Sequence, residues 1–265
     1  MDIESYIALF KKYGDPGEEY MRNAYPRYCQ TRTYINESWP ADRTRRVLDI
    51  GAHWLHQAVL FAMGGFKVTA ADFYIGEKNP VILGVAKEFG IHMVGYKDLS
   101  DPKELLSLKE NSFDLVLFSE ILEHITFNPV KMWTQIFRLL TEGGRIILTT
   151  PNYFNFFNGY FFKDIQKVLS GRSAGIKISD ILGINTFGHH WRIFSAKDIV
   201  EYFSILSPDF GVRRIEHFDY YPPGKGFLRY LKSNIQKAIP FLREGLYLEI
   251  ELKRKEAGIV VTPHW

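Results

Sequence analysis

The chain has 265 residues, of which 46% are hydrophobic, and it carries a formal net charge of +3. This length suits one sizeable α/β domain with elaborations and is short for two domains. A charge this small argues against a long nucleic-acid footprint, because such footprints need a strongly basic surface. The single cysteine, Cys29, excludes an intramolecular disulfide and is compatible with a reducing compartment.

The N-terminus lacks a basic stretch followed by an apolar core, so the sequence predicts no signal peptide. No apolar run approaches the roughly 18 residues that a membrane-spanning helix needs. We therefore expect a cytoplasmic protein without a transmembrane segment.

Two helices are expected at the start of the chain, over residues 3–13 and 17–30, followed by a polar linker over 31–45. A helix that precedes the first strand commonly covers the site of an α/β fold. Residues 1–45 are therefore predicted to form a helical lid, although a solvated helix with an aromatic packing stripe would show the same pattern. The aromatic and basic residues of the second helix are Tyr20, Arg22, Tyr25, Arg27 and Tyr28.

Residues 46–152 alternate short apolar runs, which predict buried strands, with amphipathic runs, which predict helices. Such alternation is typical of a parallel, doubly wound sheet with right-handed crossovers. This segment is predicted to be the cofactor-binding core. The expected strands are 46–50, 67–72, 91–95, 113–118 and 145–150, and the expected helices are 54–63, 79–89, 101–109 and 128–140.

The pattern loosens after residue 151. Residues 153–194 are aromatic and only partly helical, and a connection of this length is usually a binding element. We predict that 153–194 and 221–245 are substrate-side insertions of a single domain that spans residues 1–265. The regular elements expected here are helices near 160–170 and at 196–206, the latter capped by Ser195, and an antiparallel pair of strands at 211–220 and 246–252.

A carboxylate, Asp72, ends the second expected strand, 21 residues after Gly51. One carboxylate can accept two hydroxyl hydrogen bonds, so this position suits a ribose diol. The dinucleotide fingerprint G-x-G-x-x-G is missing, because only its first glycine is present. Without the other glycines a pyrophosphate cannot approach the backbone closely. The sequence therefore disfavours NAD and FAD and favours an adenosine ligand without phosphate.

Several motifs, in their order and spacing, resemble the class I S-adenosylmethionine-dependent methyltransferases, in particular the type 11, 12 and 23 groups. The resemblance covers about residues 44–152, with a looser match at 189–206. It implies a Rossmann-like, doubly wound sheet of seven strands with the last strand antiparallel, preceded here by N-terminal helices and carrying a helical, aromatic cap insertion. The motifs lie at 47–51, Asp72, 97–99, 113–124 and 139–151.

The same resemblance implies roles for residues at the strand ends in binding S-adenosylmethionine. Gly51 and its turn would face the amino-acid part of the cofactor, and Asp72 would hold the ribose hydroxyls. The loop with Asp98 and Leu99 would meet the adenine, and residues 119–120 would line the methionine side. In chain order, the predicted cofactor-binding residues are Asp49, Gly51, Ala52, Asp72, Phe73, Asp98, Leu99, Ser119 and Glu120.

A second motif, Glu120-x-x-Glu123-His124, follows the fourth expected strand. If a helix starts there, these side chains share a face, and together with His190 they could bind a divalent cation. Mg²⁺ is the expected ion, because no thiol accompanies the histidines. This pairing resembles metal-dependent 2′-O-methyltransferases of small RNAs and O-methyltransferases of the ubiquinone pathway. A metal-free alternative stays open, in which the Glu-His pair orients the cofactor loop.

Methyl transfer needs in-line positioning, and an oxygen acceptor of high pKa also needs a general base. Residues 153–162 could line an aromatic acceptor pocket or simply pack a cap helix. Residues 225–243 could form an amphipathic surface helix that contacts phosphate groups or a membrane surface. The candidate catalytic residues are His124, His189, His190 and Glu120.

We expect an enzyme that methylates an oxygen of a saccharide or another small polar metabolite, as in glycan or secondary-metabolite biosynthesis. This expectation rests on resemblance to a broad group with a T-T-P-N segment followed by a His-Trp-Arg-like segment. One alternative is metal-assisted O-methylation of RNA or of a quinone precursor, and another is a degenerate cofactor-binding subunit. The sequence also allows a homodimer and peripheral membrane contact.

Overall fold

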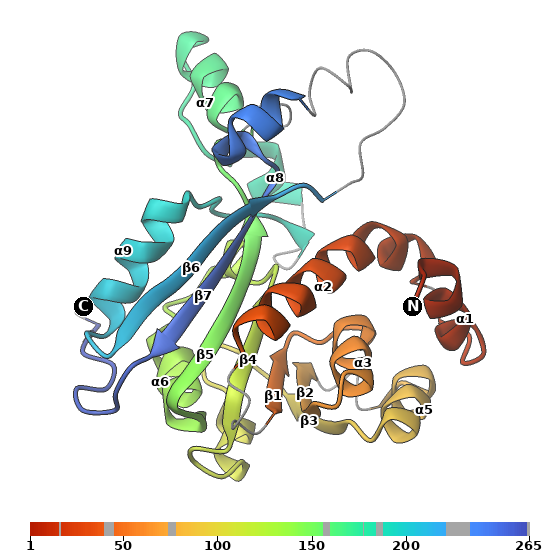
Figure 1. The fold of residues 1–265 in the computed structure, drawn as a ribbon. Helices are drawn as coiled ribbons and strands as arrows, with labels where there is room; N and C mark the ends of the chain where they lie inside the picture. Colours follow the sequence, from red (N-terminus) through yellow and green to blue (C-terminus); the bar gives the residue numbers. More distant parts are fainter. Residues whose placement is uncertain are drawn as a thin grey trace.

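The computed structural model describes residues 1–15, 17–39, 45–73, 78–155, 160–176, 178–183, 188–220 and 234–263. Within these ranges, no helix is both long and apolar enough to cross a membrane. A sheet of seven strands, in the order β3-β2-β1-β4-β5-β7-β6, forms the centre of the molecule (Figure 1).

Strands β1 to β5 pair in parallel, and β7 pairs antiparallel with both β5 and β6. This confirms the predicted Rossmann-like α/β fold with an antiparallel last strand. The strand order reverses between β1 and β4, and ligands of such sheets bind at the carboxyl ends of the strands beside this point. The strands are β1 Arg46–Ile50, β2 Lys67–Phe73, β3 His92–Tyr96, β4 Phe113–Ser119, β5 Leu140–Pro151, β6 Phe210–Phe218 and β7 Gly245–Leu252.

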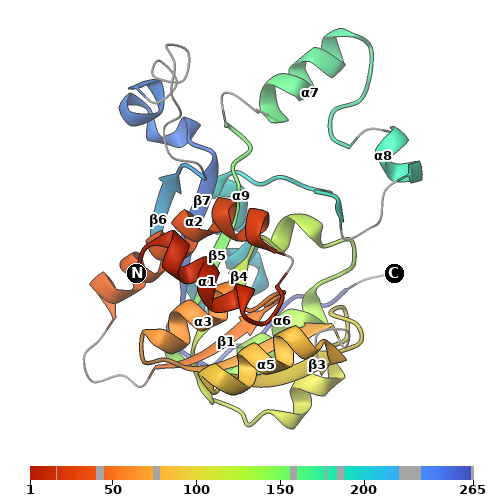
Figure 2. The ribbon, with the colours of Figure 1, turned by 90° about the vertical axis from the view of Figure 1, so that its right-hand side faces the viewer.

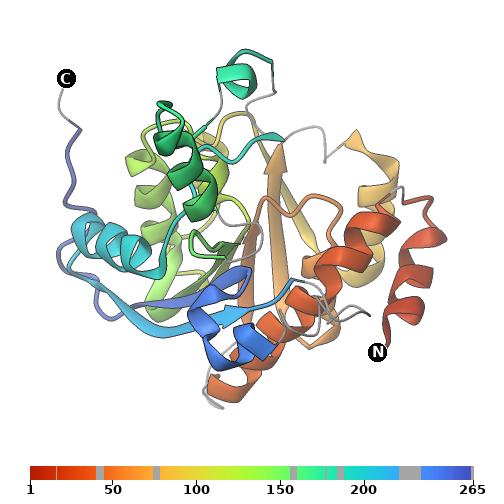
Figure 3. The same ribbon diagram turned by 90° about the horizontal axis from the view of Figure 1, so that it is seen from above.

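Helices cover both faces of the sheet, as the view from above shows (Figure 3). Side chains alternate along β4, so that Leu115 and Leu117 enter one apolar layer and Val116 and Phe118 enter the other. The first layer is closed by α1 Ile3–Lys11, α2 Glu18–Ser38, α3 His56–Met63 and α5 Pro80–Phe89, and the second by α6 Val130–Leu139 and α9 Ala196–Leu206.

A cap stands beyond the carboxyl ends of the strands (Figures 1 and 2). It contains α7, Tyr160–Leu169, and α8, Ile178–Gly183. Short 3₁₀ turns occur at Lys103–Ser107, Leu122–His124 and Pro240–Leu242. Residues 156–159 of the predicted aromatic run and residues 225–233, about half of the predicted basic surface helix, lie outside the described residues.

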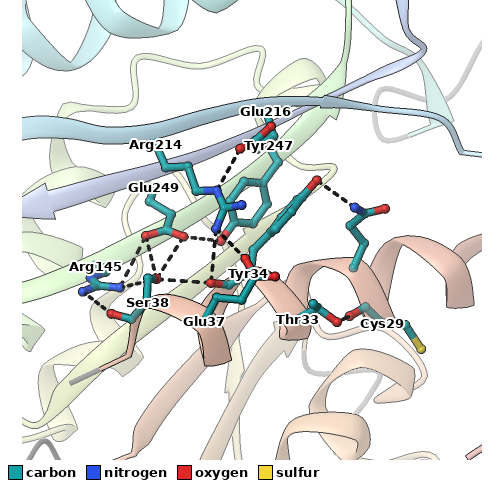
Figure 4. Close-up of polar contacts among 11 residues, drawn as sticks. Cys29, Thr33, Tyr34, Glu37, Ser38, Arg145, Arg214, Glu216, Tyr247 and Glu249 are labelled. Atoms are coloured by element: carbon teal, nitrogen blue, oxygen red, sulfur yellow. Dashed lines mark hydrogen bonds and ion pairs between the residues drawn. The ribbon is translucent and has the colours of Figure 1, made fainter. Parts of the chain in front are cut away.

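Helix α2 continues to Ser38, so the prediction of a linker from residue 31 was wrong for its first part. The guanidinium of Arg145 donates to the hydroxyl of Ser38 at 2.9 Å and to its backbone carbonyl at 3.0 Å. The carboxylate of Glu249 lies 3.4 Å from the same guanidinium (Figure 4). Arg145 thus donates a hydrogen bond to the carbonyl of Ser38, which has no partner within the helix because it lies at the helix end. Arg145 is distant in the sequence, so the local pattern does not reveal this contact.

Candidate cofactor and acceptor site

The turn between β1 and α3 lies at the carboxyl end of β1. Gly51 has a φ of 69°, and a Cβ added there would lie 2.7 Å from Cδ1 of Ile121. His53 and Leu55 also have positive φ angles, of 51° and 65°. The ring of Tyr20, from α2, meets the ring of His53 edge-on, with 5.3 Å between centroids. The turn is therefore irregular, and the ring of Tyr20 packs against it.

Two acidic side chains meet beside this turn, from the ends of neighbouring strands. Asp72 accepts hydrogen bonds from the backbone N–H groups of His53 and Phe73. Asp49 is 2% exposed, and its Oδ2 has no hydrogen-bond partner among the described residues. Burial, together with the nearby charge of Asp72, raises the pKa of Asp49 to about 8, and burial also raises the pKa of Asp72. Asp49 lacks a donor at Oδ2, and each oxygen of Asp72 has room for a further hydrogen bond, so a bound ligand could donate to both side chains.

The residues predicted for the adenine side follow β3, the strand that neighbours β2. Asp98 is exposed, and its Oδ1 accepts a hydrogen bond from the backbone N–H of Ser100 at 2.8 Å. Leu99 is buried in the apolar layer below. The ring of Phe73 packs against that of Tyr96, with 5.0 Å between centroids. These side chains therefore flank the tips of β2 and β3.

Glu120 directly follows β4 and has a φ of 55°, in the left-handed region. Its Oε2 accepts a hydrogen bond from the hydroxyl of Tyr220 at 2.8 Å and lies 3.4 Å from Nη1 of Arg27 in α2. Burial, the largest single influence, lowers the pKa of Arg27, but the carboxylate of Glu120 and three nearby tyrosines together outweigh burial and raise it. Nε of Arg27, Oε1 of Glu120 and Oγ of Ser119 are buried without a hydrogen-bond partner among the described residues.

A second cluster of polar side chains includes residues of the 3₁₀ turn Leu122–His124, which follows Glu120. One ligand atom from each of Glu123, His124 and His190 lies within 4.8 Å of the others. Glu123 is fully buried; its Oε2 accepts a hydrogen bond from the hydroxyl of Thr150 at 2.9 Å, and its Oε1 has no partner among the described residues. Nδ1 of His124 donates to the carbonyl of His189 at 3.0 Å, which leaves the lone pair on Nε2.

Both imidazoles of this cluster are neutral at pH 7. Burial lowers the pKa of His124, and burial with the neighbouring histidines lowers the pKa of His190 to about 4. The hydroxyl of Tyr160 lies 3.1 Å from Nδ1 of His190. Nε2 of the neighbouring His189 lies 3.9 Å from the carboxylate of Asp180 in the cap. Neutral imidazoles can accept a proton or ligate a metal.

Comparison with known proteins decides the family. Residues 20–204, more than half of the chain, match the family described as a methyltransferase domain. The chain belongs to this family. The predicted S-adenosylmethionine-dependent methyltransferase is thereby confirmed, and a methyl acceptor is implied. No curated protein matches this chain.

Solved structures resemble this methyltransferase domain in fold. A chain of the complex between the Haloferax volcanii Trm112 methyltransferase activator and a methyltransferase is 12% identical, with 93% of this chain and 98% of that chain covered and a TM-score of 0.57. A SAM-dependent methyltransferase of Thermotoga maritima is 15% identical, with 93% and 99% covered and a TM-score of 0.52. Phosphoethanolamine N-methyltransferase 2 of Haemonchus contortus, with phosphomonomethylethanolamine and S-adenosylhomocysteine, is 15% identical, with 85% and 52% covered and a TM-score of 0.51.

The methyltransferase domain brings together three of the four predicted metal ligands and separates the fourth. Glu120 lies with Arg27 and Tyr220 instead of joining the cluster of Glu123 and its histidine neighbours. The sequence did not point to Arg27 or Tyr220 as site residues. The available signals were an arginine among tyrosines in a helix expected to cover the site, and an aromatic cluster at 217–221 that contains Tyr220.

Proposed function

We propose that this methyltransferase domain transfers the methyl group of S-adenosylmethionine to an oxygen of a small polar acceptor, with a saccharide as the leading class. The observation that supports the donor site is the pair of carboxyl groups beside the turn at Gly51: Asp49, whose Oδ2 has no partner among the described residues, and Asp72, whose pKa is raised by burial. A ribose diol supplies donors that fit Asp72. The Glu123 cluster and the cap would then lie on the acceptor side.

Arg27 and Glu120 would hold the amino-acid end of the cofactor in this proposal. That end carries a carboxylate and an ammonium group. Nε of Arg27 is a buried donor and Oε1 of Glu120 is a buried acceptor, and neither atom has a hydrogen-bond partner among the described residues. The two charges match those of the zwitterion, and charge-assisted hydrogen bonds in a buried site are strong.

His124 is the general base of the proposed reaction, because its Nδ1 is occupied and its Nε2 is left to accept a proton. S-adenosylmethionine supplies the methyl group as a sulfonium. As the acceptor oxygen bonds to the methyl carbon and the carbon–sulfur bond breaks, the hydroxyl proton moves to Nε2 of His124. His190, with a pKa of about 4, is a weaker base and would orient the acceptor.

Calorimetry of the donor site tests the cofactor assignment. S-adenosylhomocysteine and 5′-deoxy-5′-methylthioadenosine share the nucleoside, but only the first has the amino-acid group. We expect Asp72→Asn to weaken the binding of both ligands by at least about tenfold. Arg27→Gln should weaken only the binding of S-adenosylhomocysteine by that factor. Arg22→Gln, on the same helix, is the control and should change neither.

Two outcomes contradict these assignments. Equal weakening of both ligands by Arg27→Gln would overturn the role of Arg27 in holding the amino-acid end. Failure of the unmodified protein to bind S-adenosylhomocysteine would favour the alternative of a degenerate partner subunit.

The cluster of Glu123, His124 and His190 favours a second candidate, metal-assisted methyl transfer with Mg²⁺ as the ion predicted from the sequence. A divalent cation there would ionise Glu123 and lower the pKa of the acceptor hydroxyl. Two imidazoles and one carboxylate also suit Mn²⁺ and Zn²⁺. The carboxyl–imidazole contacts support this candidate, and the pairing of Glu120 with Arg27 removes one of its four expected ligands.

Titration of the protein with MgCl₂, MnCl₂ and ZnCl₂ separates the two candidates. If a metal is used, at least one ion binds stoichiometrically. Glu123→Gln then weakens the binding of that ion by about tenfold or more, and Glu120→Gln does not. Absence of binding, with activity unchanged by EDTA, leaves the metal-free reaction with His124 as the base.

Several expectations from the sequence stay predictions. They are the lid role of residues 1–45, the core at 46–152, the substrate-side insertions, the cytoplasmic location, a homodimer and peripheral membrane contact.

A further inference from the structure

A cavity of about 1140 Å³ lies between α7, α8 and the segment 188–193. Tyr160 and His190 line it, so it adjoins the cluster that contains the proposed base. The described lining includes no residue of the turn at Gly51. Because its described lining includes His190 and no residue of that turn, we assign the cavity to the acceptor side of the proposed cofactor site.

Positive charge dominates the lining of this cavity. Lys167 is neutralised by Asp164, with 3.0 Å between Nζ and Oδ1. Asp180 is the other lining carboxylate and lies 3.9 Å from the imidazole of His189. The lining cations for which no carboxylate partner occurs among the described residues are Lys163, Arg172 and Arg192.

Aromatic rings line the same cavity. Tyr153, Tyr160 and Trp191 are each half-buried and contribute to the wall. Trp191 is held in place, because its backbone N–H donates to the carbonyl of Glu123 at 2.8 Å. Half-buried aromatic rings provide apolar faces against which a sugar ring can pack. Guanidinium groups bind phosphate in a bidentate geometry that a single ammonium group cannot supply.

We propose that this cavity binds the acceptor by an anionic phosphate group, so that the substrate is a phosphorylated saccharide. This inference rests on the proposed function and names its acceptor class. Lys163, Arg172 and Arg192 hold the phosphate, and the sugar ring packs against Tyr160 and Trp191 with a hydroxyl directed toward the histidine cluster. The volume accommodates a sugar phosphate or a larger nucleotide sugar, and the two share the recognised group.

The experiment uses the full chain saturated with S-adenosylhomocysteine and measures ligand binding by calorimetry. The probes are glucose 1-phosphate, UDP-glucose and the neutral methyl α-D-glucoside. We expect both phosphorylated probes to bind at least about tenfold more tightly than the glucoside, with a difference that shrinks at high salt. Tighter binding of UDP-glucose identifies a diphosphate ligand, and tighter binding of glucose 1-phosphate identifies a monophosphate.

A charge-matched pair of variants locates the site. Replacing Lys163, Arg172 and Arg192 together by glutamine should weaken the binding of the phosphorylated probes by at least about tenfold, the scale of three exposed ion pairs. The control replaces three exposed lysines outside the cavity, Lys87, Lys103 and Lys197, by glutamine and should not weaken them. Circular dichroism checks folding, and the three single variants replace the triple variant if it does not fold.

Three outcomes overturn the inference: the glucoside binds as tightly as the phosphorylated probes, no phosphorylated probe binds in the millimolar range, or the control variant weakens binding equally. The affinity for S-adenosylhomocysteine is measured first in each protein. Its loss from the unmodified chain would count against the proposed function, and it is read separately from probe binding.

Discussion

Arg145 of β5 forms a buried ion pair with Glu249 of β7, with 3.4 Å between Nη1 and Oε2. Their side chains are 4% and 0% exposed. The same guanidinium holds the hydroxyl and carbonyl of Ser38 at the end of α2 (Figure 4). One side chain therefore joins the antiparallel strand, the parallel sheet and the N-terminal helix.

We expect Arg145→Met to lower the free energy of unfolding by about 3–5 kcal/mol, because it leaves Glu249 as a buried charge without its counter-ion. Replacing Glu249 by leucine in the same chain should restore much of this loss. Lys12→Met, which breaks the exposed pair with Glu88, should have a much smaller effect. Denaturant titration measures all three, and equal effects of the two single variants would contradict the prediction.

A second prediction concerns pH. The pKa of Asp49 is about 8 in the folded chain, against the ordinary value of 3.8. Between roughly pH 4 and 8, the folded chain keeps a proton that the unfolded chain has lost, so stability falls as pH rises through this window. Asp49→Asn should remove this contribution and be more stable than the unmodified chain at pH 8, by a few kcal/mol, with little difference at pH 4.

Thermal melting of the ligand-free protein across this pH range checks the effect. Parallel curves for Asp49→Asn and the unmodified chain would show that Asp49 does not retain its proton.

A third prediction compares two glycines with left-handed backbones. Gly51 has a φ of 69° and faces Ile121, whereas Gly65 has a φ of 84° and nothing within 4 Å of an added Cβ. Both alanine variants should lose about 1 kcal/mol of stability from backbone strain. Only Gly51→Ala should also weaken the binding of S-adenosylhomocysteine, by about tenfold or more, because the Cβ of the new alanine displaces the turn. Calorimetry measures the affinity of both variants for S-adenosylhomocysteine. An unchanged affinity in Gly51→Ala would show that the turn is not part of the cofactor site.

A fourth prediction concerns the start of α9, which directly follows the segment with His190. The Ser195 hydroxyl accepts a hydrogen bond from the backbone N–H of Asp198 at 3.2 Å, and the Asp198 carboxylate accepts one from the backbone N–H of Ser195 at 2.7 Å. Ser195→Ala should cost about 1 kcal/mol of stability in denaturant titration. Ser204→Ala, later in the same helix, should cost less, and an equal loss would contradict a capping role.

The core of the fold could be predicted because its signals are local. The run 46–50 contains three apolar residues, is followed directly by a glycine and then by an amphipathic stretch, so strand, turn and helix each follow from neighbouring residues. The capping pair Ser195 and Asp198 likewise lies within one turn of helix. Asp72 could be placed beside Gly51 because adjacent parallel strands bring their carboxyl ends together.

The arrangement around Glu120 could not be predicted in this way. The motif suggested a helix that places Glu120, Glu123 and His124 on one face. The chain instead adopts a left-handed conformation at Glu120 and a short 3₁₀ turn after it, which removes the helical spacing. The partners Arg27 and Tyr220 come from distant parts of the sequence, so only the tertiary fold brings them to Glu120.

The contact between Arg145 and Ser38 has a consequence for where the domain begins. A shortened chain that started at β1 would contain every strand, yet it would lose the helix that covers Arg145 and Glu249 and would open their charges to water. The same truncation would remove Arg27, the counter-ion of Glu120. We therefore expect α1 and α2 to belong to the folding unit, and a fragment without them should be recovered as an aggregate or a partly folded species.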